Sequence, residues 1–265
     1  MKRTLIVLPV LLLFTFFGCS KNNPTSPQSG NGEMKMYMVD SPANFDAVFI
    51  NVTEVDVQSA TSDTASGWHI INSTPHMYEL LSLRNGISAV LGDTMLPAGH
   101  YTQIRLILGA GSYVVINGNN YDLTIPSGSQ TGIKLTNEFD IQANTTYQLT
   151  LDFDANKSIV QTGIGKYILK PTIRLVSTVT SGTISGAVLP LTANAIIWTV
   201  ANSDTVTAYA DAVSGYYKLM ALPAGTYSLN IQASDTTIFR DTTISNIVVT
   251  SGQNTNAGTI TLSTK

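Results

Sequence analysis

The sequence predicts an all-β protein with two β-sandwich domains in tandem, after a signal peptide and a flexible tether. Apolar and polar residues alternate with period two in several segments, of which Thr102–Leu108 and Tyr147–Phe153 are clear examples. Turn signals such as Asn117-Gly118 and Ser251-Gly252 lie between these segments. The one helix of note that we expect, Ile87–Leu91, is too short to define the fold.

The first segment is predicted to be a lipoprotein signal peptide. Lys2 and Arg3 are followed by the apolar run Leu5–Phe17, which is shorter than the roughly 20 residues of a membrane-spanning helix. The stretch Phe16-Phe17-Gly18-Cys19 resembles a lipobox, and Cys19 is the only cysteine. We therefore expect acylation at Cys19, with palmitate among the chains, and a lipid-anchored location in the bacterial cell envelope, at the outer membrane.

The segment after the cysteine is predicted to be a disordered tether. Ser20–Glu33 has no aromatic or branched aliphatic residue and cannot bury enough surface to fold. The expected organisation is a signal peptide at 1–18, the acylated cysteine and tether at 19–33, a β domain at 34–176, a linker at 177–182 and a second β domain at 183–265.

Charge argues against nucleic acid as a partner. The net charge of the chain is −3, and loss of Lys2 and Arg3 with the leader lowers it to about −5. No basic stripe is present. Charged residues make up 12% of the chain, about half the usual share. With a single cysteine, an intramolecular disulfide is excluded, so stability depends on apolar burial.

One six-residue pattern occurs twice. Leu96-Pro97-Ala98-Gly99-His100-Tyr101 is matched by Leu222-Pro223-Ala224-Gly225-Thr226-Tyr227. Proline and glycine favour a tight turn, and each tyrosine begins an alternating segment. We expect the same turn in both domains, with Tyr101 and Tyr227 in the cores. A further strand is predicted over Tyr167–Val176.

The second domain resembles the carboxypeptidase regulatory-like, or transthyretin-like, β-sandwich family. The resemblance rests on Ile184–Val188, Gly215–Leu219, Leu222–Leu229 and Val248–Gln253, in that order. It implies a carbohydrate-binding-like fold. Many members of the family are spacers, so the resemblance implies no particular activity.

The first domain resembles the domain of unknown function family number 4382, which is common in bacterial envelope proteins. The matching segments are Val39–Ala43, Leu80–Gly86, Leu96–Leu106, Leu149–Ala155 and Tyr167–Pro171. The resemblance implies an all-β envelope domain and nothing about its chemistry.

Four acidic residues are the candidates for a metal site. If the strand that carries Asp152 and Asp154 ends beside the loop of Asp40 and Asp46, their oxygens suit Ca²⁺. The alternative is that these carboxylates cap turns or pair with Arg84, Arg105, Lys170 or Arg174 across strands. Those cations are also candidates for binding an acidic glycan or a peptide carboxylate. No other cofactor is expected.

The predicted ligand-binding residues combine aromatic rings with cations. They are Trp68, Trp198, Tyr209, Arg84 and Arg105. Tyr209 shares a strand face with Thr205 and Thr207, which predicts an exposed ring.

The sequence favours a non-enzymatic envelope lipoprotein that binds a glycan or a partner protein, as a binding or adhesion module. The alternatives are a structural envelope component, or a glycan-acting enzyme that uses Asp152 and Asp154. No nucleophile motif or phosphate-binding loop is present.

Overall fold

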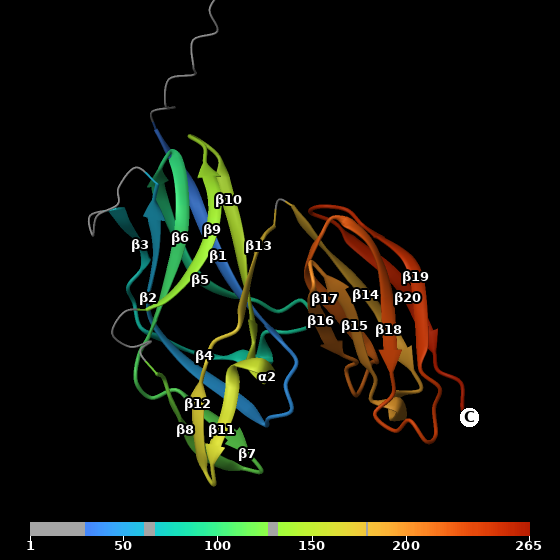
Figure 1. Ribbon diagram of the computed structural model, residues 1–265. Coiled ribbons are helices and arrows are strands. Elements are labelled where there is room, and N and C mark those ends of the chain that lie inside the picture. Colours follow the sequence, from blue (N-terminus) through green and yellow to red (C-terminus); the bar gives the residue numbers. More distant parts are fainter. Residues whose placement is uncertain (1–29, 61–66, 127–131, 179) are drawn as a thin grey trace, which may run out of the picture.

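The computed structural model describes residues 30–60, 67–126, 132–178 and 180–265. These residues form two groups of β-sheets that lie side by side (Figure 1). The all-β prediction is confirmed, and both groups are β-sandwiches. Cys19 and most of the predicted tether lie outside the described residues.

The first sandwich, which we call the first domain, packs a small sheet against a large one. The small sheet has the strand order β13 (Ile173–Ser177), β10 (Thr146–Asp154), β1 (Asn31–Ser41) and β5 (Ala89–Pro97). The large sheet has the order β11 (Ile159–Gly163), β12 (Lys166–Leu169), β8 (Asn119–Thr124), β7 (Tyr113–Ile116), β2 (Ala47–Ser59), β6 (Gly99–Leu108) and β9 (Ile133–Ile141). Strands β3 (Trp68–Asn72) and β4 (His76–Glu79) also pair with β2.

The second sandwich, the second domain, is smaller. One sheet has the order β17 (Tyr216–Pro223), β14 (Ser181–Leu189) and β20 (Asn254–Thr261). The other has the order β16 (Asp204–Tyr209), β15 (Ile196–Ala201), β18 (Gly225–Gln232) and β19 (Thr242–Val249). The described helical turns are η2 (Leu80–Ser82), α2 (Ala155–Ser158) and η3 (Leu191–Ala193).

Alternation along the strands builds the first core. In β1, Met34, Met36 and Met38 are fully buried, while Lys35 and Tyr37 between them are half-buried on the outer face. In β10 the buried set is Leu149, Leu151 and Phe153. Since β1 and β10 lie next to each other in the same sheet, these two sets share one apolar face. The second domain has its own core, in which Tyr217, Leu219, Leu229 and Ile231 are buried.

The repeated Leu-Pro-Ala-Gly pattern forms the same structure in both domains. Ala98 joins β5 to β6, and Ala224 joins β17 to β18. The Tyr101 hydroxyl donates to the carbonyl of Pro97 at 2.9 Å, and the Tyr227 hydroxyl donates to the carbonyl of Pro223 at 2.7 Å. Tyr101 is buried, and Tyr227 is half-buried against the second core. The expected shared turn is confirmed.

Two local predictions are wrong. Ile87–Leu91 is not helical, because β5 begins at Ala89 and pairs with β1. The predicted strand Tyr167–Val176 is two strands, β12 and β13, which belong to different sheets. Pro171 lies between them and has no N–H to donate to a ladder. Lys170 and Arg174, which one continuous strand would place on the same face, therefore do not share a strand.

The outer face of the small sheet positions the second domain. Thr150 and Asp152 of β10 point away from the core of the first domain, yet both are buried. Val39 of β1 is 3% exposed although it lies on the same outer face. Figure 1 shows the second domain beside this sheet. Contact with the second domain explains why residues on an outward face lose their solvent exposure.

Candidate functional site

The loop Arg84-Asn85-Gly86 of the first domain forms hydrogen bonds with the second domain. The Asn85 side-chain amide donates to the carbonyl of Tyr209, and its oxygen accepts from the backbone N–H of Lys218, both at 3.2 Å. Asn85 has a φ of 55° and Gly86 a φ of 101°, so the Asn-Gly pair suits the left-handed turn that the loop makes. One asparagine side chain therefore binds two strands of the second domain.

A second connection passes through Arg174 of β13. Its guanidinium donates to Asp152 at 2.5 Å and to the backbone carbonyl of Ala221 in β17 at 2.6 Å. Asp152 and Arg174 are direct partners in the β10–β13 register. The expected pairing of Asp152 or Asp154 with a cation across strands is thus confirmed for Asp152 and Arg174. Ala221 has a φ of 55°, an unfavourable conformation for a residue with a Cβ.

Asp40 and Asp152 are buried carboxylates at this interface. Asp40 is 5% exposed, and its Oδ1 accepts from the backbone N–H of Ala155 at 3.0 Å. No hydrogen-bond partner contacts its Oδ2 within the described structure. Burial raises the pKa of Asp40 well above its usual range, and the charges of Asp152 and Asp154 act in the same direction. Burial also raises the pKa of Asp152, although Arg174 and a hydrogen bond from Ser41 oppose the shift.

The four acidic candidates do not form a calcium site. Asp154 accepts from the backbone N–H of Lys157 as the cap of α2, and Asp46 accepts from Gly118 N–H in a separate turn. Asp152 is neutralised by Arg174. Over the ranges that the structure describes, no group of three or more acidic, histidine or cysteine side chains has metal-binding geometry. The alternative, capping and cross-strand pairing, is the one that the structure supports.

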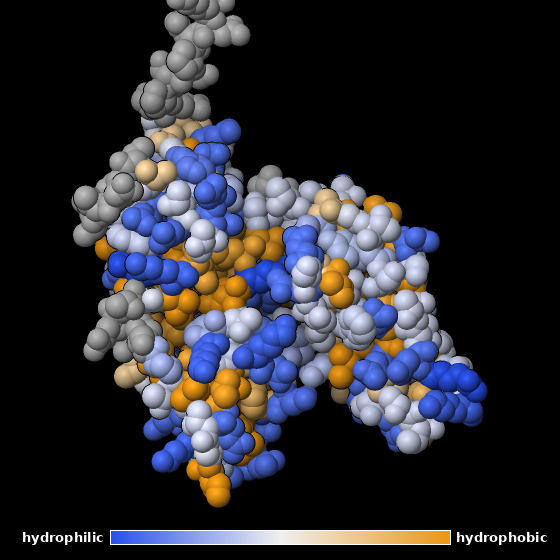
Figure 2. Space-filling model, in the orientation of Figure 1, coloured by the Kyte–Doolittle hydropathy of each residue, from blue (hydrophilic) through white to orange (hydrophobic). Residues whose placement is uncertain are grey.

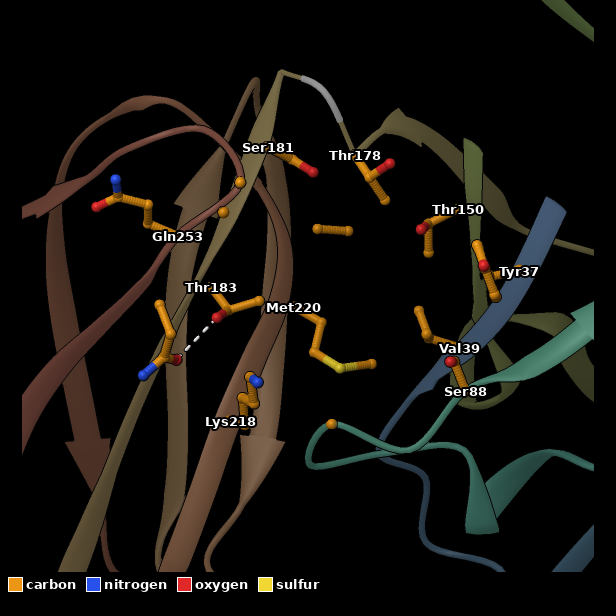
Figure 3. Close-up of a pocket in the computed structure, with 15 residues that line it drawn as sticks. Tyr37, Val39, Ser88, Thr150, Thr178, Ser181, Thr183, Lys218, Met220 and Gln253 are labelled. Atoms are coloured by element: carbon orange, nitrogen blue, oxygen red, sulfur yellow. Dashed lines mark hydrogen bonds between the residues drawn. The ribbon is translucent and has the colours of Figure 1, made fainter. Parts of the chain in front are cut away.

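A cleft of about 400 Å³ opens between the domains. The first domain contributes Tyr37, Ser88 and Thr150, and the second contributes Thr183, Lys218 and Gln253. Figure 3 shows Thr150 and Thr183 on opposite sides of the cleft, with Met220 reaching toward Val39, while the Gln253 side chain extends away from the first domain. Thr183 donates to the side-chain oxygen of Asn254 at 2.8 Å. The volume falls within the range of about 300–1,000 Å³ typical of small-molecule sites.

The predicted aromatic and cationic residues are distributed over several places. Trp68 and Arg105 do come together, with the guanidinium carbon 4.5 Å from the ring centroid. Arg105 also pairs with Asp56, its Nε donating at 2.7 Å, and with Glu54 at 3.7 Å. This group lies on the large sheet of the first domain, whereas the cleft borders the small sheet. Its cation is already engaged by two carboxylates.

The other candidates lie elsewhere. Trp198 is half-buried on the outer face of β15, opposite Thr207 and Asn230 in the neighbouring strands. The prediction of an exposed ring at Tyr209 is wrong. The ring is half-buried at the interface, and its hydroxyl donates to the side chain of Asn44 at 2.9 Å. Arg84 and Asp40 line a small cavity of about 10 Å³, which shares Val39, Lys218 and Met220 with the lining of the cleft.

Sequence reasoning missed Lys218, Met220 and Gln253. Lys218 and Met220 alternate with buried Tyr217 and Leu219, so their outward direction follows from the period of the strand. That they face another domain depends on the placement of β17 beside the first domain, which no local pattern encodes. Asn85-Gly86 has a sequence typical of a turn, but nothing local indicates that it contacts the second domain.

Lipidation at Cys19 remains a prediction, because Cys19 lies outside the described residues. Among the residues that the structure describes, no helix has the length and apolar character needed to cross a membrane.

Comparison with solved structures gives matches at low identity. The minor pilin GBS52 of Streptococcus agalactiae is 9% identical over 88% of this chain and 96% of that chain, with a TM-score of 0.26. The shaft pilin SpaA of Lactobacillus rhamnosus GG is 9% identical over 89% and 98% of the two chains, with a TM-score of 0.25. The Bacillus anthracis TIE protein is 11% identical, with a TM-score of 0.24, and the match spans 88% of this chain but 34% of that protein.

The first domain matches a known protein family. No curated protein matches the sequence significantly. A family model described as Domain of unknown function (DUF4382) matches residues 31–171, more than half of the chain. This match confirms the resemblance seen in the first domain, and the chain belongs to that family.

Proposed function

We propose that the protein is a non-enzymatic, lipid-anchored binding module of the bacterial envelope, and that it binds a glycan in the cleft between its domains. The observation that carries this proposal is the lining of the cleft. Side chains with hydroxyl groups line the cavity from both domains, amide side chains line it from the second domain, and Tyr37 contributes an aromatic ring. Such groups suit the hydroxyls and apolar faces of sugars.

A glycan array read with the full chain tests this proposal. Tyr37→Ala should abolish or strongly reduce binding, because it removes the aromatic ring that lines the cleft. Tyr216→Ala is the matched control, since Tyr216 is an exposed strand tyrosine that does not line the cleft. Absence of binding to any glycan would refute the proposal. Equal loss in both variants would place the binding site elsewhere.

The anchor is a separate part of the proposal. It is supported by the leader and the lipobox-like stretch that ends at Cys19. Two or more acyl chains on one cysteine give persistent membrane attachment, whereas one chain binds only marginally. Labelling with a fatty-acid analogue should mark the wild type and not Cys19→Ser. Fractionation should place the wild type in the outer membrane, and retention of Cys19→Ser there would refute the anchor.

The second domain completes the cleft in this proposal. Its order of segments supports assignment to the carboxypeptidase regulatory-like family. The sequence predicts domains at 34–176 and 183–265 with a linker at 177–182, and the first strands of the two domains begin slightly earlier, at Asn31 and Ser181. In this view it is a spacer that also supplies one wall of the binding site.

The alternatives have less support. An enzyme that uses Asp152 and Asp154 would need accessible carboxylates, but Asp152 is buried against Arg174 and Asp154 caps α2. Turnover of a glycan that is lost in Asp152→Asn would establish the enzyme. A purely structural envelope component would bind no glycan, so the array separates it from the binding module.

A further inference from the structure

Lys218 is the cation at the base of the cleft. Tyr217 and Leu219 on either side are fully buried in the second core, so the strand period directs Lys218 and Met220 outward. Strand β17 is the edge of its sheet, and its outward face meets the first domain. The Lys218 side chain is half-buried as a result, and it lines the cleft.

Lys218 has no carboxylate partner. The ion pairs found among the described residues involve Lys35, His100, Arg105, Lys157 and Arg174, and none involves Lys218. Of the described residues that line the cleft, none is an aspartate or glutamate. A half-buried ammonium without a counter-ion is costly to desolvate, so an anionic group from outside would compensate it.

The neighbouring carboxylates do not take that place. Asp152 is held by Arg174 and Ser41. Asp40 lies in the small adjoining cavity, where Arg84 is a second cation. Burial raises the pKa of Asp40 well above its usual range. Among the described residues that line the cleft, Lys218 is the one with a charged side chain, in a chain whose formal net charge is −3.

We propose that the glycan bound in the cleft is an acidic polysaccharide, and that the Lys218 ammonium contacts a carboxylate of one of its sugars. The hydroxyl and amide groups around Lys218 contact the remaining sugar hydroxyls. This inference rests on the proposed glycan-binding function and adds the chemical class of the ligand. A lysine supplies a compact charge to a carboxylate, without the fixed two-pronged geometry of arginine.

Binding of purified full-length protein in detergent to three acidic polysaccharides tests the inference. The probes are polygalacturonate, alginate and hyaluronate, each compared with its methyl ester, which keeps the sugar and removes the charge. At least one acid form should bind more tightly than its ester. Lys218→Met should weaken binding of that acid form about tenfold, the loss of one charge-assisted contact, and leave binding of the ester unchanged.

Two variants control the experiment. Lys166→Met removes an exposed lysine from β12, far along the chain from the cleft residues, and should leave binding unchanged. Lys218→Arg keeps the charge and should retain most of the preference for the acid form. Unchanged melting temperatures would show that the variants are folded. We expect a neutral side chain at residue 218 to leave the fold intact, because the Lys218 side chain makes no hydrogen bond or ion pair in the described structure.

The outcomes separate this inference from the proposed function. If neutral glycans bind as tightly as acidic ones, the acidic class is wrong and glycan binding stands. If no glycan binds, both fail. Equal weakening by Lys166→Met would show nonspecific attraction and overturn the role of Lys218. Binding of poly-glutamate as tight as that of the acidic glycans would overturn the polysaccharide class.

Discussion

Replacing Arg174 with methionine should lower the free energy of unfolding by about 3–5 kcal/mol. The guanidinium makes two short hydrogen bonds, to Asp152 and to the carbonyl of Ala221, and both partners are 7% exposed. A hydrogen bond to a charged group contributes about 1.5–3 kcal/mol. The variant also leaves the Asp152 carboxylate buried, with Ser41 as its remaining partner.

Urea unfolding at neutral pH measures this loss. Lys157→Met is the control, because Lys157 is 52% exposed in its ion pair with Asp154 and should contribute at most about 1 kcal/mol. The double variant Arg174→Met with Asp152→Asn should be more stable than the sum of the single losses predicts, by about 1–3 kcal/mol. Equal losses for Arg174→Met and Lys157→Met would refute the buried-pair reasoning.

Three further variants test other contacts. Asn85→Ala should cost about 1–3 kcal/mol in urea unfolding, because it removes two interdomain hydrogen bonds, and Asn85→Gly should cost less because glycine tolerates the φ of 55°. Tyr101→Phe and Tyr227→Phe should each cost about 1 kcal/mol, and a melting temperature unchanged in either would contradict the shared corner. The folded-state pKa of Asp40 is raised, so its stabilising contribution is complete below about pH 4 and is lost as pH rises through that pKa. Asp40→Asn should therefore gain stability relative to wild type as pH increases, and parallel pH profiles would refute this.

The sequence predicts strands well where burial alternates. In Tyr147–Phe153, the buried Leu149, Leu151 and Phe153 alternate with polar residues, and this pattern depends only on which face lies toward the core. The Pro-Ala-Gly turns are likewise local, because proline and glycine set the backbone there. The strand predicted across Pro171 failed because alternation continued through a residue that cannot pair, and the two halves belong to different sheets.

The candidate site was harder to predict than the fold. The Asp152–Arg174 pair was among the options that the sequence offered, since both residues lie in strand segments. Lys218 was not, because its significance depends on which face of β17 meets the first domain. Tyr209 illustrates the same limit. Its position on an outward strand face was read correctly, but that face is covered by Asn44 from a loop 165 residues away in the chain.

The pairing of β1 has a consequence for the order of folding. Strand β1 pairs with β10 in parallel, with Met34 opposite Tyr147 and Ser41 opposite Asp154. It also pairs with β5, so it is an inner strand of the small sheet. Because β1 and β10 are more than a hundred residues apart in the chain, a long loop must close before any contact between these two strands forms. During synthesis or export, β1 must therefore wait, unpaired on one side, until the chain through Asp154 has emerged. During that time the edge of β1 that later pairs with β10 has free backbone N–H and C=O groups, which another strand could bind.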